Sequence, residues 1–226
     1  MKRKALRNER SVILPVDFAL LETLLWQPVD GYFLLDRHLD RLRQSGRYFG
    51  FAVDVRRVEE ALAAAIADAT AGPLRVRLVV SFTGDCQVTT RVMPAPAAPV
   101  LRVALARLPV NSADPFLHHK TTRRTVYESA KSEYPHLDDV ILHNMRGEVT
   151  ESTRANVVIE RNGQKVTPPL RCGLLAGTFR AELLASGELS EAVIPVAELQ
   201  SLQSFFLINS VRRWMTAVPM ALKTQP

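Results

Sequence analysis

The segment His118-His119-Lys120-Thr121-Thr122-Arg123-Arg124 is followed, 31 residues after its lysine, by Glu151 within Val149-Thr150-Glu151-Ser152. Lys120 offers an amine in a polar, hydroxyl-rich segment, and Glu151 offers a carboxylate at the end of a strand-like segment. Neighbouring positive charge lowers the pKa of an amine and makes it nucleophilic near neutral pH. An amine that forms a Schiff base and an acid that keeps a pyridine nitrogen protonated are the two groups that pyridoxal phosphate chemistry requires.

Each residue of this pair also has an ordinary interpretation. Lys120 can also be read as a surface lysine at the start of a helix, which is the usual place of a lysine, and Glu151 as a solvent-facing acid at a strand end. Ser152, Thr153 and Asn156 follow the glutamate and supply groups that would orient its carboxylate by hydrogen bonds. The rest of the chain therefore has to support the pair.

Composition limits the classes of protein to which the chain can belong. Of 226 residues, 47% are hydrophobic and 23% are charged, which is typical of a globular protein with a buried core. The net charge is +6, and residues 1–10 hold five bases, one acid and no aromatic residue, so we interpret them as a solvated arm rather than a nucleic-acid surface. The cysteines Cys86 and Cys172 and the five histidines show no metal-ligand spacing, and no apolar run has the length of a membrane span. We expect a cytoplasmic protein with free thiols, no metal, no nucleic-acid partner and no membrane contact.

Hydrophobic periodicity predicts an α/β (α+β) chain in two parts. Residues 17–26 read equally as a buried strand or a short helix. We expect a small N-terminal α/β domain over residues 1–108 and a larger, β-rich C-terminal α/β domain over residues 109–226, which would bind the cofactor. Predicted helices cover residues 35–49, 55–69 (opened by Asp54), 120–134 and 177–184. Predicted strands cover residues 75–82, 86–93, 101–106, 139–143, 155–161, 165–167 and, as the last strand, 205–208, with a further strand that begins at 149.

Two features are compatible with an anion site. The segment Gly173-Leu174-Leu175-Ala176-Gly177-Thr178-Phe179-Arg180 is a glycine-bracketed loop that leads into a predicted helix, where free backbone N–H groups can bind an anion. It matches neither a P-loop nor a dinucleotide fingerprint, and a simple capped loop explains it equally well. Arg41 reads either as an exposed helix arginine or as a planar guanidinium that binds phosphate.

Taken together, five segments in this order and spacing resemble the class IV pyridoxal phosphate aminotransferase family, also called fold-type IV. The resemblance extends from about Phe18 to Val218, which is most of the chain. The segments are Leu21-Glu22-Thr23-Leu24; His38-Leu39-Asp40-Arg41-Leu42 with Ser45; Lys120-Thr121-Thr122; Gly147-Glu148-Val149-Thr150-Glu151 with Asn156; and Thr167-Pro168-Pro169 with Gly173 to Arg180.

The resemblance implies a cofactor, a fold and roles for individual residues. The cofactor is pyridoxal 5'-phosphate, held between two α/β domains, and family members are usually homodimers. The implied roles are Lys120 as the Schiff-base lysine, Glu151 as the acid on the pyridine nitrogen, Arg41 as the phosphate-binding arginine, the backbone amides of Thr178 and Phe179 as the phosphate cup, and Ser210 as a phosphate-contacting hydroxyl.

Within the family, Thr23 and the segment Asn209-Ser210-Val211-Arg212-Arg213-Trp214 are similar to aminodeoxychorismate lyases. This similarity implies conversion of 4-amino-4-deoxychorismate to p-aminobenzoate and pyruvate for folate biosynthesis, alongside an aminodeoxychorismate synthase. Thr23 would assist catalysis, and Arg212 and Arg213 would pair with carboxylates of the small-molecule substrate, unless they are surface charges.

Two departures from the lyase pattern concern substrate choice. Asp17-Phe18-Ala19-Leu20 replaces a common Gly-Asp-Gly segment, and one residue is inserted between Asn209 and Val218. A transaminase acting on branched-chain or D-amino acids therefore remains an alternative. A binding domain that has lost the cofactor is a second alternative, and the presence of Lys120 and Glu151 argues against it.

Overall fold

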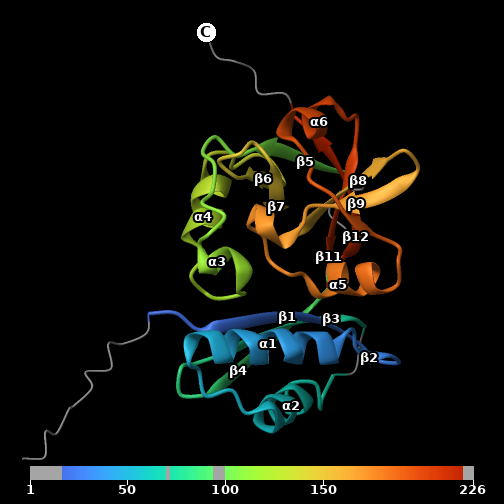
Figure 1. Ribbon diagram of the computed structural model, residues 1–226. Coiled ribbons are helices and arrows are strands. Elements are labelled where there is room, and N and C mark those ends of the chain that lie inside the picture. The colour runs from blue at the N-terminus through green and yellow to red at the C-terminus, as the bar shows by residue number, and fades with distance from the viewer. Residues whose placement is uncertain (1–16, 70–71, 94–99, 221–226) are drawn as a thin grey trace, which may run out of the picture.

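The computed structural model describes residues 17–69, 72–93 and 100–220; the basic arm and most of the proline-rich segment 93–100 lie outside the described residues. The fold is mixed α/β, as predicted, and has two sheets (Figure 1). The order of the first is β2-β1-β3-β4, and the order of the second is β10-β9-β8-β11-β12-β5-β6-β7. In Figure 1 the smaller sheet and its two helices lie below the larger sheet, with α5 at the junction.

The smaller sheet is packed on one face by two helices. Its elements are β1 (Leu20–Gln27), β2 (Gly31–Tyr32), α1 (Leu35–Phe49), α2 (Val55–Ala64), β3 (Leu74–Val80) and β4 (Cys86–Val92). Leu24 and Val76 pack against Leu42 of α1 and Leu62 of α2 on this face. Since side chains alternate along a strand, Leu21 and Thr23 point to the opposite face, toward the second sheet. Residues 17–26, which read as strand or helix, therefore contain a strand.

The two helices of the smaller sheet follow the sequence pattern to different extents. Helix α1 has the predicted bounds and is capped by Gly50, whose φ of 76° suits glycine. Helix α2 begins, as expected, after Asp54, whose side chain accepts a hydrogen bond from the Arg56 N–H at 3.0 Å. It ends at Ala64 and not near residue 69, because the following residues form a looser turn with hydrogen bonds such as Ala67 N–H to Ala64 O.

The larger sheet begins earlier in the chain than the domain prediction implies. Strand β5 (Val100–Leu105) lies in the middle of it, parallel to its neighbours β12 and β6. The expected boundary after residue 108 would separate this strand from its partners, so we propose a boundary between β4 and β5. The other elements are α3 (Pro115–His118), α4 (Thr125–Ser132), β6 (Asp139–His143), β7 (Val149–Ser152), β8 (Asn156–Arg161), β9 (Gln164–Thr167), η1 (Leu170–Cys172), α5 (Thr178–Ala185), β10 (Ser190–Glu191), α6 (Val196–Ser201), β11 (Phe205–Asn209) and β12 (Arg213–Pro219).

Two sequence predictions in this part were wrong. The helix predicted from residue 120 starts only at Thr125, because the backbone around Lys120 pairs with β1 instead. Strand β11 is not the last strand: β12 returns antiparallel to it after a turn in which the Asn209 side chain accepts from the N–H groups of Val211 and Arg212. Among the described residues, no helix combines the length and the apolar character that crossing a bilayer requires.

Candidate active site

A cavity of about 1140 Å³ separates the outer face of the smaller sheet from the loops of the larger one. This volume is ample for a cofactor together with a small substrate. The predicted site residues that line it are Thr23, Arg41, Lys120, Glu151, Thr178, Ser210 and Arg212. Arg213 is not brought to the cavity: it is exposed, and its guanidinium carbon lies 4.4 Å from the centre of the Phe33 ring. The Phe179 side chain packs in the core with Val158 and Ile208, so only its backbone remains a candidate.

Lys120 is held by backbone pairing rather than by a helix. Its carbonyl accepts a hydrogen bond from the Leu21 N–H at 3.0 Å, and Thr122 N–H donates to Ala19 O at 2.9 Å. The remaining exposed surface of the lysine faces the cavity. Burial, and next the positive charge of Arg41, lower the pKa of the Lys120 amine to about 8. The amine therefore has a substantial neutral fraction at physiological pH, which a nucleophile or general base requires.

Glu151 lies on β7 and is 4% exposed. Its Oε1 accepts hydrogen bonds from the Tyr127 hydroxyl at 2.7 Å and from the Leu175 N–H at 3.2 Å. Burial raises the pKa of this carboxyl to about 7, against the opposing effect of both hydrogen bonds. Across the ladder, Asn156 faces Glu151 and donates to Leu175 O at 2.9 Å. The acid is therefore fixed on a strand. Because burial disfavours its charged form, a cationic ring nitrogen beside it would stabilise the carboxylate.

Arg41 belongs to a buried chain of polar groups that links α1, β1 and α5. Its Nε and Nη2 donate to the two carboxylate oxygens of Glu22 at 2.8 and 2.6 Å, and its Nη1 donates to Ala176 O at 3.0 Å. His38 bonds Glu22 through Nδ1 at 2.7 Å and the Thr178 hydroxyl through Nε2 at 3.2 Å. Burial alone would raise the pKa of Glu22, but Arg41 and His38 lower it well below its usual range. The ionised carboxylate therefore fixes Arg41 at the cavity wall.

His38 is a neutral link in this chain. Burial lowers the pKa of its imidazole despite the neighbouring Glu22 carboxylate. A neutral ring satisfies both of its hydrogen bonds when Nδ1–H donates to Glu22 and Nε2 accepts from Thr178. The orientation of the Thr178 hydroxyl is thereby set from the far side of the cavity wall.

The start of α5 fits a phosphate group. The helical hydrogen bonds of α5 begin with the N–H of Ala181, which donates to Gly177 O at 2.8 Å. The N–H groups of Thr178 and Phe179 come before it, so they have no acceptor within the helix. A Cβ on Gly177 would lie 2.0 Å from Asn156 Oδ1, so no side chain can occupy this place. Free amides at the positive end of a helix, beside the Arg41 guanidinium, form a site for a dianionic phosphate. The residues present therefore fit pyridoxal phosphate.

Thr23 and Ser210 meet on the wall formed by the smaller sheet. Ser210 is buried, and its hydroxyl donates to the Thr23 carbonyl at 3.5 Å. Thr23 lies opposite Arg77 in the β1–β3 ladder, with its side chain on the cavity face. Both predicted residues are thus in the same cavity as Lys120 and Glu151.

Sequence reasoning missed three residues that hold the site. Glu22 fixes Arg41, His38 bonds Glu22, and Tyr127 bonds Glu151. Glu22 gave a signal, since it is a charged residue inside the apolar run 17–26. His38 stands in the segment His38-Leu39-Asp40-Arg41-Leu42, which carries the resemblance, but the sequence assigned it no role. Tyr127 gave no signal, because it lies on a predicted helix and its partner is distant in the sequence.

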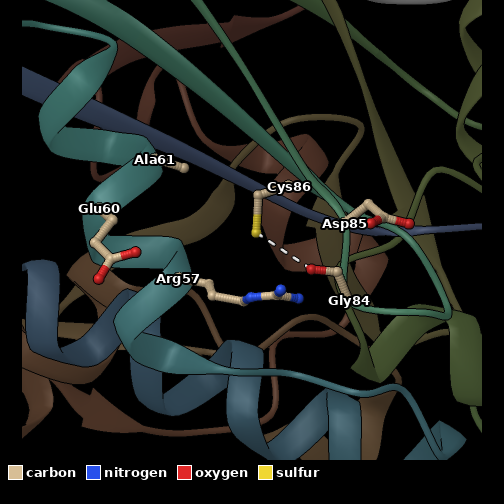
Figure 2. A pocket seen from close by; sticks show the side chains of 6 residues that line it. All are labelled: Arg57, Glu60, Ala61, Gly84, Asp85 and Cys86. Atoms are coloured by element: carbon tan, nitrogen blue, oxygen red, sulfur yellow. Dashed lines mark hydrogen bonds between the residues drawn. The ribbon is translucent and has the colours of Figure 1, made fainter.

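A smaller cavity of about 340 Å³ lies between α2 and the β3–β4 turn (Figure 2). Figure 2 shows Cys86 pointing at the Gly84 carbonyl and Arg57 extending toward it from α2. The Cys86 sulfur lies 3.6 Å from that carbonyl oxygen. It shares no lining residue with the larger cavity and contains neither Lys120 nor Glu151.

Comparison with known proteins agrees with this geometry. A sequence model of the amino-transferase class IV family matches residues 19–218. A Schizosaccharomyces pombe protein, provisionally named an aminodeoxychorismate lyase, is 34% identical over 206 residues, which is 86% of each chain. A Thermotoga maritima protein, named a probable branched-chain-amino-acid aminotransferase, is 26% identical over 87% of this chain and 78% of its own.

Solved structures give the same result. A provisionally named amino-acid aminotransferase from Mesorhizobium loti superposes with a TM-score of 0.85 at 39% identity, over 90% of this chain and 100% of its own. The PLP-bound form of an aminotransferase from Mycobacterium tuberculosis superposes with a TM-score of 0.74 at 25% identity, over 89% and 81% of the two chains. The chain therefore belongs to the class IV aminotransferase family and is an enzyme whose cofactor is pyridoxal phosphate.

Proposed function

We propose that this enzyme converts 4-amino-4-deoxychorismate to p-aminobenzoate and pyruvate. The observation that carries the proposal is the 34% identity, over 86% of both chains, with the Schizosaccharomyces pombe protein provisionally named for this activity. The placement of Thr23 on the cavity wall with Lys120 and Glu151 supports it.

Lys120 would act as the proton acceptor of the reaction. Bound pyridoxal phosphate supplies a ring that accepts the electron pair left at the amine-bearing carbon of the substrate. The Lys120 amine, with its pKa lowered to about 8, is suited to removing the proton from that carbon near neutral pH. Glu151 would hold a proton at the pyridine nitrogen, and its fixed position on β7 supports that role.

The second half of the reaction is an elimination that needs no further reactant. The bond between the neighbouring ring carbon and the enolpyruvyl oxygen breaks, and the electron pair left where Lys120 removed the proton forms the third double bond of the ring, which makes it aromatic. Enolpyruvate leaves, takes up one proton in place of the one that Lys120 removed, and becomes pyruvate. Thr23 would donate a hydrogen bond to the departing oxygen. General acid–base help of this kind typically contributes about a hundred- to ten-thousandfold in rate.

The test is to supply 4-amino-4-deoxychorismate to the holoenzyme and follow p-aminobenzoate by its fluorescence. We expect stoichiometric p-aminobenzoate and pyruvate, and neither product with Lys120→Ala. Lys131→Ala is the matched control, since Lys131 does not line the cavity and bonds Tyr134 O. Absence of p-aminobenzoate from a holoenzyme with bound cofactor would reject the lyase proposal.

A transaminase acting on branched-chain or D-amino acids is the second candidate. The branched-chain aminotransferase from Thermotoga maritima, at 26% identity, favours it. The first step, transfer of a proton to Lys120, would be the same. The proton would then be delivered to a carbon of the cofactor, and a keto acid would be released. Amino transfer from valine or D-alanine to 2-oxoglutarate, without p-aminobenzoate formation, would select this candidate.

We also propose that the enzyme is a homodimer and that it acts beside an aminodeoxychorismate synthase. Both follow from the family resemblance. Light scattering of the purified holoenzyme at twice the 25.2 kDa chain mass would support the dimer, and a single-chain mass would reject it. Co-elution with a synthase tests the second part.

A further inference from the structure

Arginines line the mouth of the large cavity on the side of the smaller sheet. Arg75 and Arg77 are two residues apart on β3, so both side chains point to the cavity face. Arg91 on β4 lies directly opposite Arg75 in the ladder. Like charges directly opposite each other destabilise a sheet, so this arrangement is unfavourable without a counter-charge.

Two more arginines approach from the larger sheet. Arg154 lies in the β7–β8 turn, and Arg212 lies in the β11–β12 turn, and both line the same cavity. Asn209 joins these turns: its Nδ2 donates to Arg154 O at 3.3 Å, and its Oδ1 accepts from Arg212 N–H at 2.8 Å. We name the whole set the arginine rim; its members are Arg75, Arg77, Arg91, Arg154 and Arg212.

Within the described ranges, no guanidinium of the arginine rim donates a hydrogen bond or pairs with a carboxylate, whereas the three acids of the cavity all have partners. Asp138 accepts from Arg102 N–H at 2.7 Å, Asp139 accepts from the Ser152 hydroxyl at 2.8 Å, and Glu151 is bonded as described above. Partial burial, and then the charges of the other four members, lower the pKa of the Arg75 guanidinium. The donors of the rim are therefore free for an anion.

We propose that the arginine rim binds a second carboxylate of the substrate, so that this enzyme acts on dicarboxylates. The inference deepens the proposed lyase function and rests on it for the identity of the reaction. The substrate 4-amino-4-deoxychorismate carries two carboxylates, whereas a branched-chain amino acid carries one. Guanidinium groups match carboxylates through paired hydrogen bonds, and convergence from two walls suits an anion held between them.

The rim is separate from the cofactor phosphate site. Arg41 is directed by Glu22 and by the Ala176 carbonyl toward the start of α5. No member of the rim takes part in that chain of hydrogen bonds. The cavity thus offers one anion site at α5 and a second site at its mouth.

Equilibrium dialysis of the holoenzyme with isophthalate and benzoate, at fixed ionic strength, tests the proposal. The two probes share a ring, lack an amine and differ by one carboxylate, so neither enters the reaction. We expect isophthalate to bind about ten- to a hundredfold more tightly, as hydrogen bonds between charged groups allow. The double variant Arg75→Gln, Arg91→Gln, and separately Arg212→Gln, should remove most of this difference and leave the visible absorbance of the cofactor intact.

The matched control is Arg56→Gln, Arg57→Gln, which removes the same charge from exposed positions of α2 outside this cavity. It should leave the preference unchanged. Equal binding of the two probes by the wild type, or an unchanged preference in the rim variants, overturns the proposal. If the enzyme prefers the dicarboxylate but forms no p-aminobenzoate, the lyase proposal is rejected and carboxylate binding by the arginine rim stands. If it forms p-aminobenzoate without that preference, the lyase proposal stands and carboxylate binding by the rim is rejected.

Discussion

Glu22→Gln is the substitution that most directly tests how the cofactor site is built. Glu22 is 2% exposed and accepts hydrogen bonds from Arg41 at 2.8 and 2.6 Å and from His38 at 2.7 Å. Glutamine keeps the shape but removes the charge and places an amide N–H₂ among donors. The Arg41 side chain, itself 11% exposed, then loses its only ion-pair partner among the described residues.

The size of the effect follows from burial. Removing one partner of a buried ion pair typically costs about 3–5 kcal/mol, because the other charge remains uncompensated. The side-chain oxygen of the glutamine still accepts a hydrogen bond, and Arg41 reaches the solvent of the cavity. We therefore expect a cost at the lower end of this range. A loss of about 3 kcal/mol corresponds to roughly 150-fold in the folding equilibrium. Because Arg41 is then free to leave the wall, we also expect the dissociation constant of pyridoxal phosphate to rise about tenfold or more.

Urea unfolding of the cofactor-free protein and titration with pyridoxal phosphate measure the two effects separately. Asp40→Asn is the matched control, since Asp40 pairs with Arg43 on the same helix at the same 2.6 Å. That pair is solvent-exposed, with side-chain exposures of 43% and 61%, so its loss should cost about 0.5 kcal/mol or less. Equal losses in the two variants, or an unchanged cofactor affinity in Glu22→Gln, would refute the reasoning.

Acid pH should remove the difference between wild type and Glu22→Gln. The pKa of Glu22 is lowered in the folded state, so its stabilisation is fully present above the ordinary value of 4.5. It is lost as the pH falls from there toward the folded-state pKa. The gap in unfolding free energy should therefore be constant from pH 5.5 to 7 and shrink below pH 4.5. A gap that persists at low pH would mean that packing, and not charge, stabilises this site.

Three further substitutions test the remaining parts of the site. Lys120→Ala should abolish turnover and the visible absorbance of bound cofactor, and Lys131→Ala should change neither; near-normal activity without Lys120 contradicts its assignment. Glu151→Gln should keep the cofactor and lose about a hundredfold or more in kcat, with an unchanged rate as the contrary outcome. Burial raises the pKa of Glu151 to about 7, so stability is lost as the pH rises from the ordinary value of 4.5 to 7. Over that range the free energy of unfolding of the cofactor-free wild type should fall by about 3 kcal/mol more than that of Glu151→Gln, as urea unfolding at pH 4.5 and at pH 7 would measure. Gly177→Ala would place a Cβ 2.0 Å from Asn156 Oδ1 and should weaken cofactor binding about tenfold; an unchanged dissociation constant would show that the loop yields.

Local patterns predicted the elements whose own sequence specifies them. Helix α1 matched its apolar spacing, and the turn at Asn162-Gly163 joined β8 and β9 as expected. The sequence predicted a helix at Lys120 because the flanking residues suit one. Strand β2, however, pairs only with the last residues of β1, and the start of β1 on the same edge pairs with residues 120–122. Tertiary pairing overrides local propensity there, and the competing strand lies a hundred residues away in the sequence.

The same limit applies to the chemistry, because the site depends on which face of β1 each residue occupies. Glu22 shares the helix-covered face and fixes Arg41, whereas Thr23 lies on the cavity face opposite Arg77. A slip of one residue in the β1–β3 register would exchange the faces of one of the two strands, so that either Leu24 of β1 would be exposed to the cavity or the arginines of β3 would be buried against α1. The apolar residues on the helix-covered face therefore set the register. The register in turn places the arginine rim, and it places Glu22, which fixes Arg41, the arginine that we propose to bind the phosphate.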